Sequence, residues 1–128
     1  MKFENSQKVL QAWLDAVHSG DLEAVGAMYA DDAVLIPTFS RKYRTCCDSR
    51  RDYFSHVSTK PGLRVEVLDE SVTEQRLGNS LYVLGGLYNW FNDSAEGEQV
   101  VLARFTYVID LESDGPIVHH HSSECPAT

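Results

Sequence analysis

Apolar residues near the amino terminus recur at the three- and four-residue spacing of an α-helix. A first stripe runs from Ser6 to Val17 and consists of Val9, Leu10, Trp13, Ala16 and Val17. A second stripe, made of Leu22, Val25, Met28 and Tyr29, follows Asp21, a suitable N-cap, and Asp31-Asp32 closes it. The spacing predicts two helices joined as a short antiparallel hairpin.

The segment after these helices changes character. Residues 33–37 (AVLIP) are too few for a helix and end at a proline, which predicts a brief strand. Residues 38–48 (TFSRKYRTCCD) follow neither the helical nor the strand period and predict a loop. Asp48 is a good N-cap for a third helix over Ser49–Val57.

The remaining chain follows the two-residue period of β-strands. Leu63, Val65 and Val67 alternate with neighbours of the other face, which predicts a strand that continues to Thr73. Further strands are expected at Ser80–Phe91, Gln99–Leu111 and Pro116–Ser123, separated by the turn-rich segments NDSAEGE and ESDG. The order predicts an α+β fold, with three helices on one face of a curved antiparallel four-stranded meander.

Composition limits the classes of protein to consider. The 128 residues suit one domain, residues 1–128, and 43% hydrophobic with 23% charged residues is an ordinary globular balance. No apolar run reaches 18 residues, so no membrane span is expected, and a formal charge of −8 disfavours nucleic acid as a partner. The first residues lack the features of a secretory signal, which predicts a cytoplasmic protein with its three cysteines reduced.

Three consecutive histidines are the most unusual local feature. On a strand, His119 and His121 share one face, while His120 lies on the other face with Ser122. One strand supplies at most two metal ligands from this run, whereas a zinc site needs three or four that converge. We expect no cofactor, and a metal site stays an alternative that would require His18, His56 or a carboxylate from elsewhere.

Two further strands carry candidate binding residues. Arg104 lies in the otherwise apolar segment VLARFTYVI, where it predicts either a buried salt bridge or an anion site on the concave face of the sheet. Tyr82, Tyr88 and Trp90 share one alternating face with Gly86 between them. This pattern predicts either ordinary core packing or a small cavity lined by aromatic rings.

Several motifs together resemble a known family. They are Ala12-Trp13 with Ser19-Gly20-Asp21, LIPTFS at 35–40, RDYF at 51–54, ARFTY at 103–107, and HHHSS at 119–123 with Pro126. In these motifs the chain resembles the nuclear transport factor 2-like superfamily and, within it, the bacterial branch of the calcium/calmodulin-dependent kinase II association-domain family. That branch includes the iota-class carbonic anhydrases, whose closing signature is HHHSS followed two residues later by proline.

The resemblance implies a fold, a reaction and a set of site residues. The fold would be a cone-shaped roll with a pocket at its wide end, and the reaction the reversible hydration of carbon dioxide to bicarbonate, in some members without a metal. The catalytic hydroxyls would come from Thr38, Tyr53 and Ser122, with His120 as a proton shuttle. The expected substrate contacts are Arg104, Tyr88 and Ser123.

Two other functions fit the same resemblance. One is an oligomeric association domain whose pocket binds a small anion without turnover. The other is a SnoaL-like isomerase or cyclase, which needs a general base and a hydroxyl donor in the pocket. All three predict a homodimer or larger homo-oligomer, because a sheet covered on one side leaves its other face open.

Overall fold

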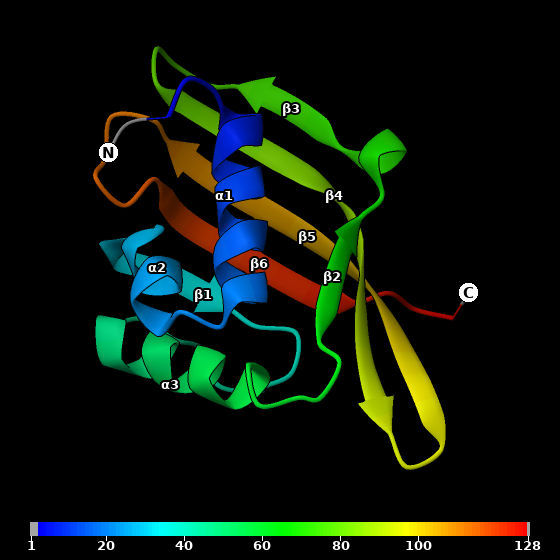
Figure 1. The fold of residues 1–128 in the computed structure, drawn as a ribbon. Coiled ribbons are helices and arrows are strands. Elements are labelled where there is room, and N and C mark those ends of the chain that lie inside the picture. The colour runs from blue at the N-terminus through cyan, green and yellow to red at the C-terminus, as the bar shows by residue number, and fades with distance from the viewer. Residues whose placement is uncertain (1–2, 128) are drawn as a thin grey trace.

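Three helices pack against one face of a curved sheet in the computed structural model, which describes residues 3–127 (Figure 1). The helices are α1 (Ser6–Ser19), α2 (Leu22–Ala27) and α3 (Cys47–Val57), and a short 3₁₀ helix spans Asp69–Ser71. The strands are β1 (Tyr29–Ile36), β2 (Arg64–Val67), β3 (Thr73–Arg76), β4 (Leu81–Ser94), β5 (Gly97–Asp110) and β6 (Ile117–Glu124). The α+β class predicted from the sequence is confirmed.

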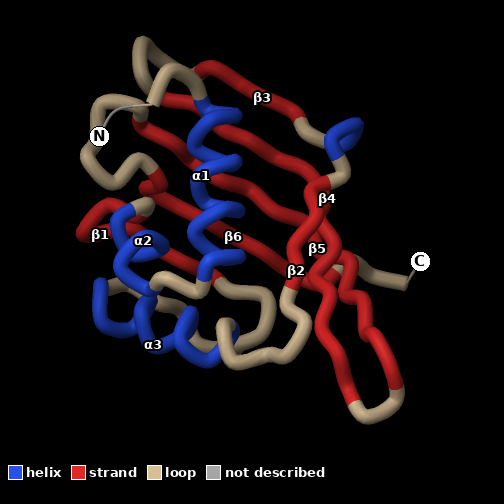
Figure 2. The backbone as a smooth tube through the Cα atoms, in the orientation of Figure 1, coloured by secondary structure: helices blue, strands red, loops and turns tan. Residues whose placement is uncertain are grey.

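The sheet is mixed rather than wholly antiparallel. Its order is β1-β6-β5-β4-β2, and β3 pairs with another part of β4 (Figure 2). The pairs formed among β2 to β6 are antiparallel, as expected, but β1 runs parallel to β6. The expectation of an antiparallel sheet is therefore wrong for β1, because a two-residue period shows which side chains share a face but not which strand is the partner.

The second helix ends earlier than its apolar spacing predicts. It stops at Ala27, and Tyr29 already belongs to β1. The Met28 carbonyl accepts a hydrogen bond from the Ile117 N–H at 2.9 Å, so pairing with β6 replaces the helical bonds. Tertiary pairing thus overrides a local helical pattern.

Two other predicted boundaries differ as well. The strand expected from Leu63 to Thr73 is divided into β2 and β3 by the 3₁₀ helix, where the Ser71 hydroxyl accepts from the Leu87 N–H at 2.8 Å. Helix α3 begins at Cys47, so its N-cap is Cys46 and not Asp48. Both differences arise from polar contacts, which the spacing of hydrophobic residues does not predict.

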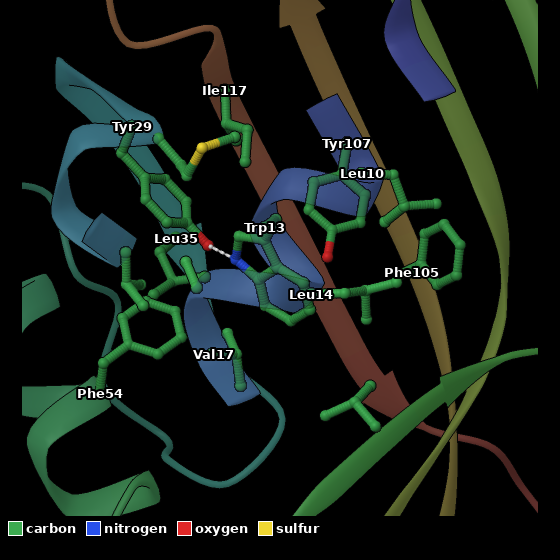
Figure 3. Close-up of a cluster of buried hydrophobic side chains, with 14 of the residues drawn as sticks. Leu10, Trp13, Leu14, Val17, Tyr29, Leu35, Phe54, Phe105, Tyr107 and Ile117 are labelled. Atoms are coloured by element: carbon green, nitrogen blue, oxygen red, sulfur yellow. Dashed lines mark hydrogen bonds between the residues drawn. The ribbon is translucent and has the colours of Figure 1, made fainter. Parts of the chain in front are cut away.

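The core lies between the helices and the inward face of β4, β5 and β6. In β5 the buried residues are Ala103, Phe105, Tyr107 and Ile109, and the residues between them face outward. Trp13 of α1 is fully buried at the centre of this core (Figure 3). Its ring contacts those of Phe54, Tyr88, Trp90, Tyr107 and His120.

Helix α3 is held to β1 by a buried arginine. Arg50 is 3% exposed, and its guanidinium donates to the carbonyls of Ala33 at 2.8 Å and Ala30 at 3.0 Å. Since its hydrogen bonds go to backbone oxygens, Arg50 has a structural role. It positions the next turn of α3, which carries Tyr53.

Within residues 3–127, no helix has the length and apolar character needed to cross a membrane.

Candidate functional site

A small, partly open cavity lies between the helices and the sheet. Its volume is about 10 Å³, roughly the space that one water molecule occupies. None of its lining residues is charged at neutral pH; they are Trp13, Leu35, Pro37, Thr38, Tyr53, Phe54, Tyr88, Trp90, His120 and Ser122. Four residues of the predicted catalytic set, Thr38, Tyr53, His120 and Ser122, are therefore brought to one cavity, together with Tyr88.

Three hydroxyl groups meet on one side of this cavity. Thr38 follows the end of β1, Ser122 lies on the inward face of β6, and the two hydroxyls are hydrogen-bonded to each other. The Tyr88 hydroxyl, from β4, donates to Ser122 Oγ at 2.7 Å. Ser122 is 3% exposed and Tyr88 is fully buried, so solvent does not compete for these hydrogen bonds.

A fourth hydroxyl comes from α3. Tyr53 Oη accepts a hydrogen bond from the Phe39 N–H at 3.4 Å, and its own hydrogen is available to a ligand. Burial raises the pKa of Tyr53 to about 12 and also raises the pKa of Tyr88. Both phenols are therefore protonated at neutral pH, and the site offers hydroxyl donors rather than a phenolate nucleophile.

His120 is a buried, neutral member of the site. Its Nδ1 lies 2.8 Å from the Tyr29 hydroxyl and its Nε2 lies 3.3 Å from the Tyr88 hydroxyl. Burial, with smaller contributions from His119 and His121, lowers the pKa of His120 to about 3. A pKa this low does not favour the expected role as a proton shuttle, which assumed an ordinary pKa, because the neutral ring holds no extra proton in the working range.

The buried imidazole makes the stability of the fold depend on pH. The unfolded chain protonates His120 below its ordinary pKa of 6.5, whereas the folded chain resists protonation down to about 3. The stabilisation is thus present above pH 6.5, and the free energy of unfolding should fall by up to about 1.4 kcal/mol per pH unit on acidification. Urea unfolding between pH 7 and 4 measures this slope. The His120→Gln variant should have a shallower slope, and equal slopes for both proteins would contradict a neutral buried imidazole.

One donor in the cavity wall has no partner. Trp90 is 3% exposed, and its indole N–H makes no hydrogen bond of full geometry within the described chain, although it lies near enough to the Tyr88 hydroxyl to offset part of the rise in the pKa of that phenol. A buried donor without an acceptor is unfavourable by about 1–3 kcal/mol, so the group is available for a ligand oxygen. The sequence pattern placed Trp90 in an aromatic-lined cavity but not in the catalytic set. The unpaired N–H becomes visible only in three dimensions.

The structure does not bring Arg104 and Ser123 to the cavity. Arg104 is exposed on the outward face of β5, and Ser123 is its register partner on β6, on that same face. Burial of Ala103 and Phe105 shows which phase of the strand faces inward. The expected burial of Arg104 is therefore wrong. The inward positions of VLARFTYVI are the more apolar ones, so the sequence already indicated that Arg104 faces outward.

Other cations lie close to the cavity instead. The Arg44 guanidinium stands over the Tyr53 ring at 5.6 Å and also contacts Asp52 Oδ2 at 3.1 Å. Lys60 Nζ lies 4.7 Å from the centre of the Phe39 ring, which itself packs edge-on against Trp90. Positive charge therefore lies outside the wall, while the interior carries none.

The described residues contain no metal-ligand cluster. Over residues 3–127, no three His, Cys, Asp or Glu side chains converge in a way that could hold a metal ion. His18 Nε2 accepts a hydrogen bond from the Val65 N–H at 3.0 Å, and His56 is exposed at the end of α3. Neither lines the cavity with His120.

The cone of three helices on a curved sheet, closed around a small pocket, defines a nuclear transport factor 2-like protein. The profile of the SnoaL-like domain matches residues 7–128, and the chain belongs to this family. A structure from Xanthomonas campestris, described as a calcium/calmodulin-dependent protein kinase II association domain, is 29% identical with a TM-score of 0.84. The alignment covers 95% of this chain and 86% of that one.

More distant structures share the fold. A dehydratase-type protein of the NTF2-like family from Streptomyces avermitilis is 13% identical with a TM-score of 0.80, and 94% of each chain is covered. The calcium/calmodulin-dependent kinase II hub of S. rosetta is 18% identical with a TM-score of 0.76, and 93% of each chain is covered. None of the curated proteins compared with the chain matches it.

Proposed function

We propose that this protein hydrates carbon dioxide to bicarbonate in the cavity between Thr38, Tyr53, Trp90 and Ser122. The observation that carries the proposal is an uncharged cavity of about 10 Å³ that is lined by hydroxyl groups and by Trp90, whose buried indole N–H has no hydrogen-bond partner among the described residues. Pockets that hold drug-sized ligands measure about 300–1,000 Å³, so this cavity favours a reactant of a few atoms.

The proposed reaction joins one water, which the cavity holds, to one carbon dioxide that approaches from the open side of the cavity. The water oxygen, held by the Thr38 and Ser122 hydroxyls, forms a bond to the carbon, and one C=O electron pair moves onto its oxygen. Hydrogen bonds from Trp90 N–H and the Tyr53 hydroxyl stabilise that developing negative charge. The water loses one proton to solvent, which leaves bicarbonate and H⁺.

The electrostatics around the cavity support this assignment. Neutral carbon dioxide enters an uncharged interior without the desolvation cost of an ion. The bicarbonate product is an anion, and Arg44 and Lys60 lie just outside the wall where they attract it outward. Arg44 and Lys60 thus take the anion-attracting role that the sequence suggested for Arg104.

Stopped-flow measurement of carbon dioxide hydration tests the proposal on protein treated with a strong chelator. We expect a kcat/KM above about 10⁴ M⁻¹s⁻¹, the lower end of ordinary enzymes. In the same preparation, bicarbonate should shift the NMR signal of the Trp90 indole N–H. A rate equal to that of buffer alone would overturn the proposed reaction.

A second candidate is an association domain, and the Xanthomonas and S. rosetta structures favour it. Its pocket would bind a small anion without turnover, and the chain would assemble through the outward face of the sheet, where Val100 and Leu102 are 51% and 37% exposed. Light scattering that shows a large ring, together with no hydration activity, would favour this function. A homodimer fits either candidate.

A third candidate is an isomerase or cyclase of the SnoaL-like type. The matched family favours it, as does a ketosteroid isomerase-like structure from Erwinia carotovora with 14% identity and a TM-score of 0.74, in which 94% of this chain and 93% of that chain are covered. Such an enzyme would need a general base in the pocket, and the cavity would have to open for a larger substrate. Turnover of an enolisable ketone by the purified protein would select this function.

A further inference from the structure

A continuous series of hydrogen bonds leads from α1 to the cavity, and its first half fixes the tautomer of His120. The Trp13 indole N–H donates to the Tyr29 hydroxyl at 2.9 Å, and that hydroxyl lies 2.8 Å from His120 Nδ1 (Figure 3 shows the first of these bonds). An indole N–H can only donate, so the Tyr29 oxygen is the acceptor and its own hydrogen remains for Nδ1.

The reverse arrangement leaves a buried hydrogen without an acceptor. If Nδ1 carried the ring hydrogen, the Tyr29 O–H would find no other acceptor among its contacts in the described chain. A buried donor in that state is unfavourable by about 1–3 kcal/mol. Because a neutral imidazole carries only one N–H, the hydrogen of His120 is on Nε2.

The second half of the series carries this direction to the cavity. His120 Nε2–H faces the Tyr88 oxygen at 3.3 Å, and Tyr88 donates to Ser122 Oγ at 2.7 Å. Ser122 and Thr38 share one hydrogen bond but own two hydroxyl hydrogens. One of those hydrogens is therefore left over in the wall of the cavity, which Trp90 also lines.

We infer that Trp13 and Tyr29 are positioning residues that set the direction of this series and so make the cavity a receptor for ligand oxygens that accept hydrogen bonds. With the opposite direction, Thr38 would donate to Ser122, Ser122 to Tyr88 and Tyr88 to His120. Both hydroxyl hydrogens would then be used within the series, and Thr38 and Ser122 would offer a ligand only the lone pairs of their oxygens. The identity of the ligand, carbon dioxide or bicarbonate, rests on the proposed function, but the direction of the series does not.

NMR of the wild-type protein measures the tautomer of His120 directly, and a variant is needed only to assign the signals. Long-range ¹H–¹⁵N NMR of the histidine rings distinguishes Nε2–H from Nδ1–H, and the His120 signals are assigned by their loss in His120→Gln. We expect Nε2–H in the wild-type protein at pH 7. In Tyr29→Phe, Nδ1 loses its hydrogen-bond donor, so its ¹⁵N signal should move to that of an unbonded ring nitrogen and the preference for Nε2–H should weaken. The kcat/KM for carbon dioxide hydration should fall about tenfold.

Tyr107→Phe is a matched control for Tyr29→Phe. Tyr107 is also fully buried and its ring stacks on His120 at 3.9 Å, but its hydroxyl has no hydrogen-bond partner within the described chain. The variant loses the same atom beside the same imidazole and removes none of the hydrogen bonds of the series. We expect an unchanged tautomer and a rate within twofold of the wild type.

The possible outcomes separate this inference from the proposed reaction. A wild-type Nδ1–H tautomer, or a Tyr29→Phe protein whose Nδ1 signal is unchanged, would overturn the inference whatever the activity. The expected tautomers in a protein with no hydration activity would support the series and overturn only the reaction. An equal tautomer change in Tyr107→Phe would also overturn the inference, since it would show a general effect of packing.

Discussion

Replacement of Ser122 by alanine should lower the kcat/KM for carbon dioxide hydration by about 100-fold, the usual effect of removing one preorganised hydrogen-bonding group from an active site. Ser122 Oγ accepts a hydrogen bond from the Tyr88 hydroxyl at 2.7 Å and is hydrogen-bonded to the Thr38 hydroxyl. Its loss therefore frees the Tyr88 and Thr38 hydroxyls to rotate. The Tyr88 hydroxyl also loses its acceptor, which should reduce the free energy of unfolding by about 1–3 kcal/mol. Stopped-flow rates and urea unfolding measure the two effects.

Ser123→Ala is the natural control for this change. Ser123 is the next residue of β6 and has the same side chain, but it lies on the opposite face, as the register partner of the exposed Arg104. Its replacement should leave the rate within twofold of the wild type. Equal losses in Ser122→Ala and Ser123→Ala would contradict the assignment of the cavity as the site.

Trp13→Ala should produce the largest loss of stability of any single change discussed for this chain, about 3–5 kcal/mol. Trp13 is fully buried, stacks on Tyr88 with ring centres 6.2 Å apart, and contacts His120 edge-on at 5.5 Å. Its removal opens the centre of the core and leaves the Tyr29 hydroxyl without its donor. Urea unfolding at pH 7 gives the change in free energy.

An exposed aromatic residue supplies the comparison for Trp13. Tyr43 is 62% exposed, and Tyr43→Ala should change the free energy of unfolding by no more than about 0.5 kcal/mol. A loss below about 1 kcal/mol in Trp13→Ala would contradict the central packing of the indole. The two variants together separate the effect of burial from that of losing an aromatic ring.

Local patterns predicted a good part of the candidate site. The two-residue period of β6 placed His120 and Ser122 on one face, and both are buried while His121 is exposed. The resemblance of the motifs brought in Thr38 and Tyr53, which line the same cavity. His120 and Ser122 could be predicted from the sequence because side-chain alternation is a property of a single strand.

The incorrect predictions concerned features that depend on contacts between residues far apart in the sequence. The parallel pairing of β1 with β6 joins segments about 90 residues apart, and it also ended α2 before Tyr29. The pKa of His120 depends on how completely Trp13, Tyr29 and Tyr107 enclose its ring. No local pattern carries such information, because enclosure is a property of the assembled core.

The sequence by itself determined the α+β class, the inward face of β6 and an acidic chain of net charge −8. The tertiary structure alone decided that the cavity is small and uncharged, that Arg44 lies near it, and that the Trp90 N–H has no hydrogen-bond partner among the described residues. The physical reason is the range of the interactions. Periodicity and capping act within a few residues, whereas cavity size, pKa and the direction of a hydrogen-bond series arise where several elements meet.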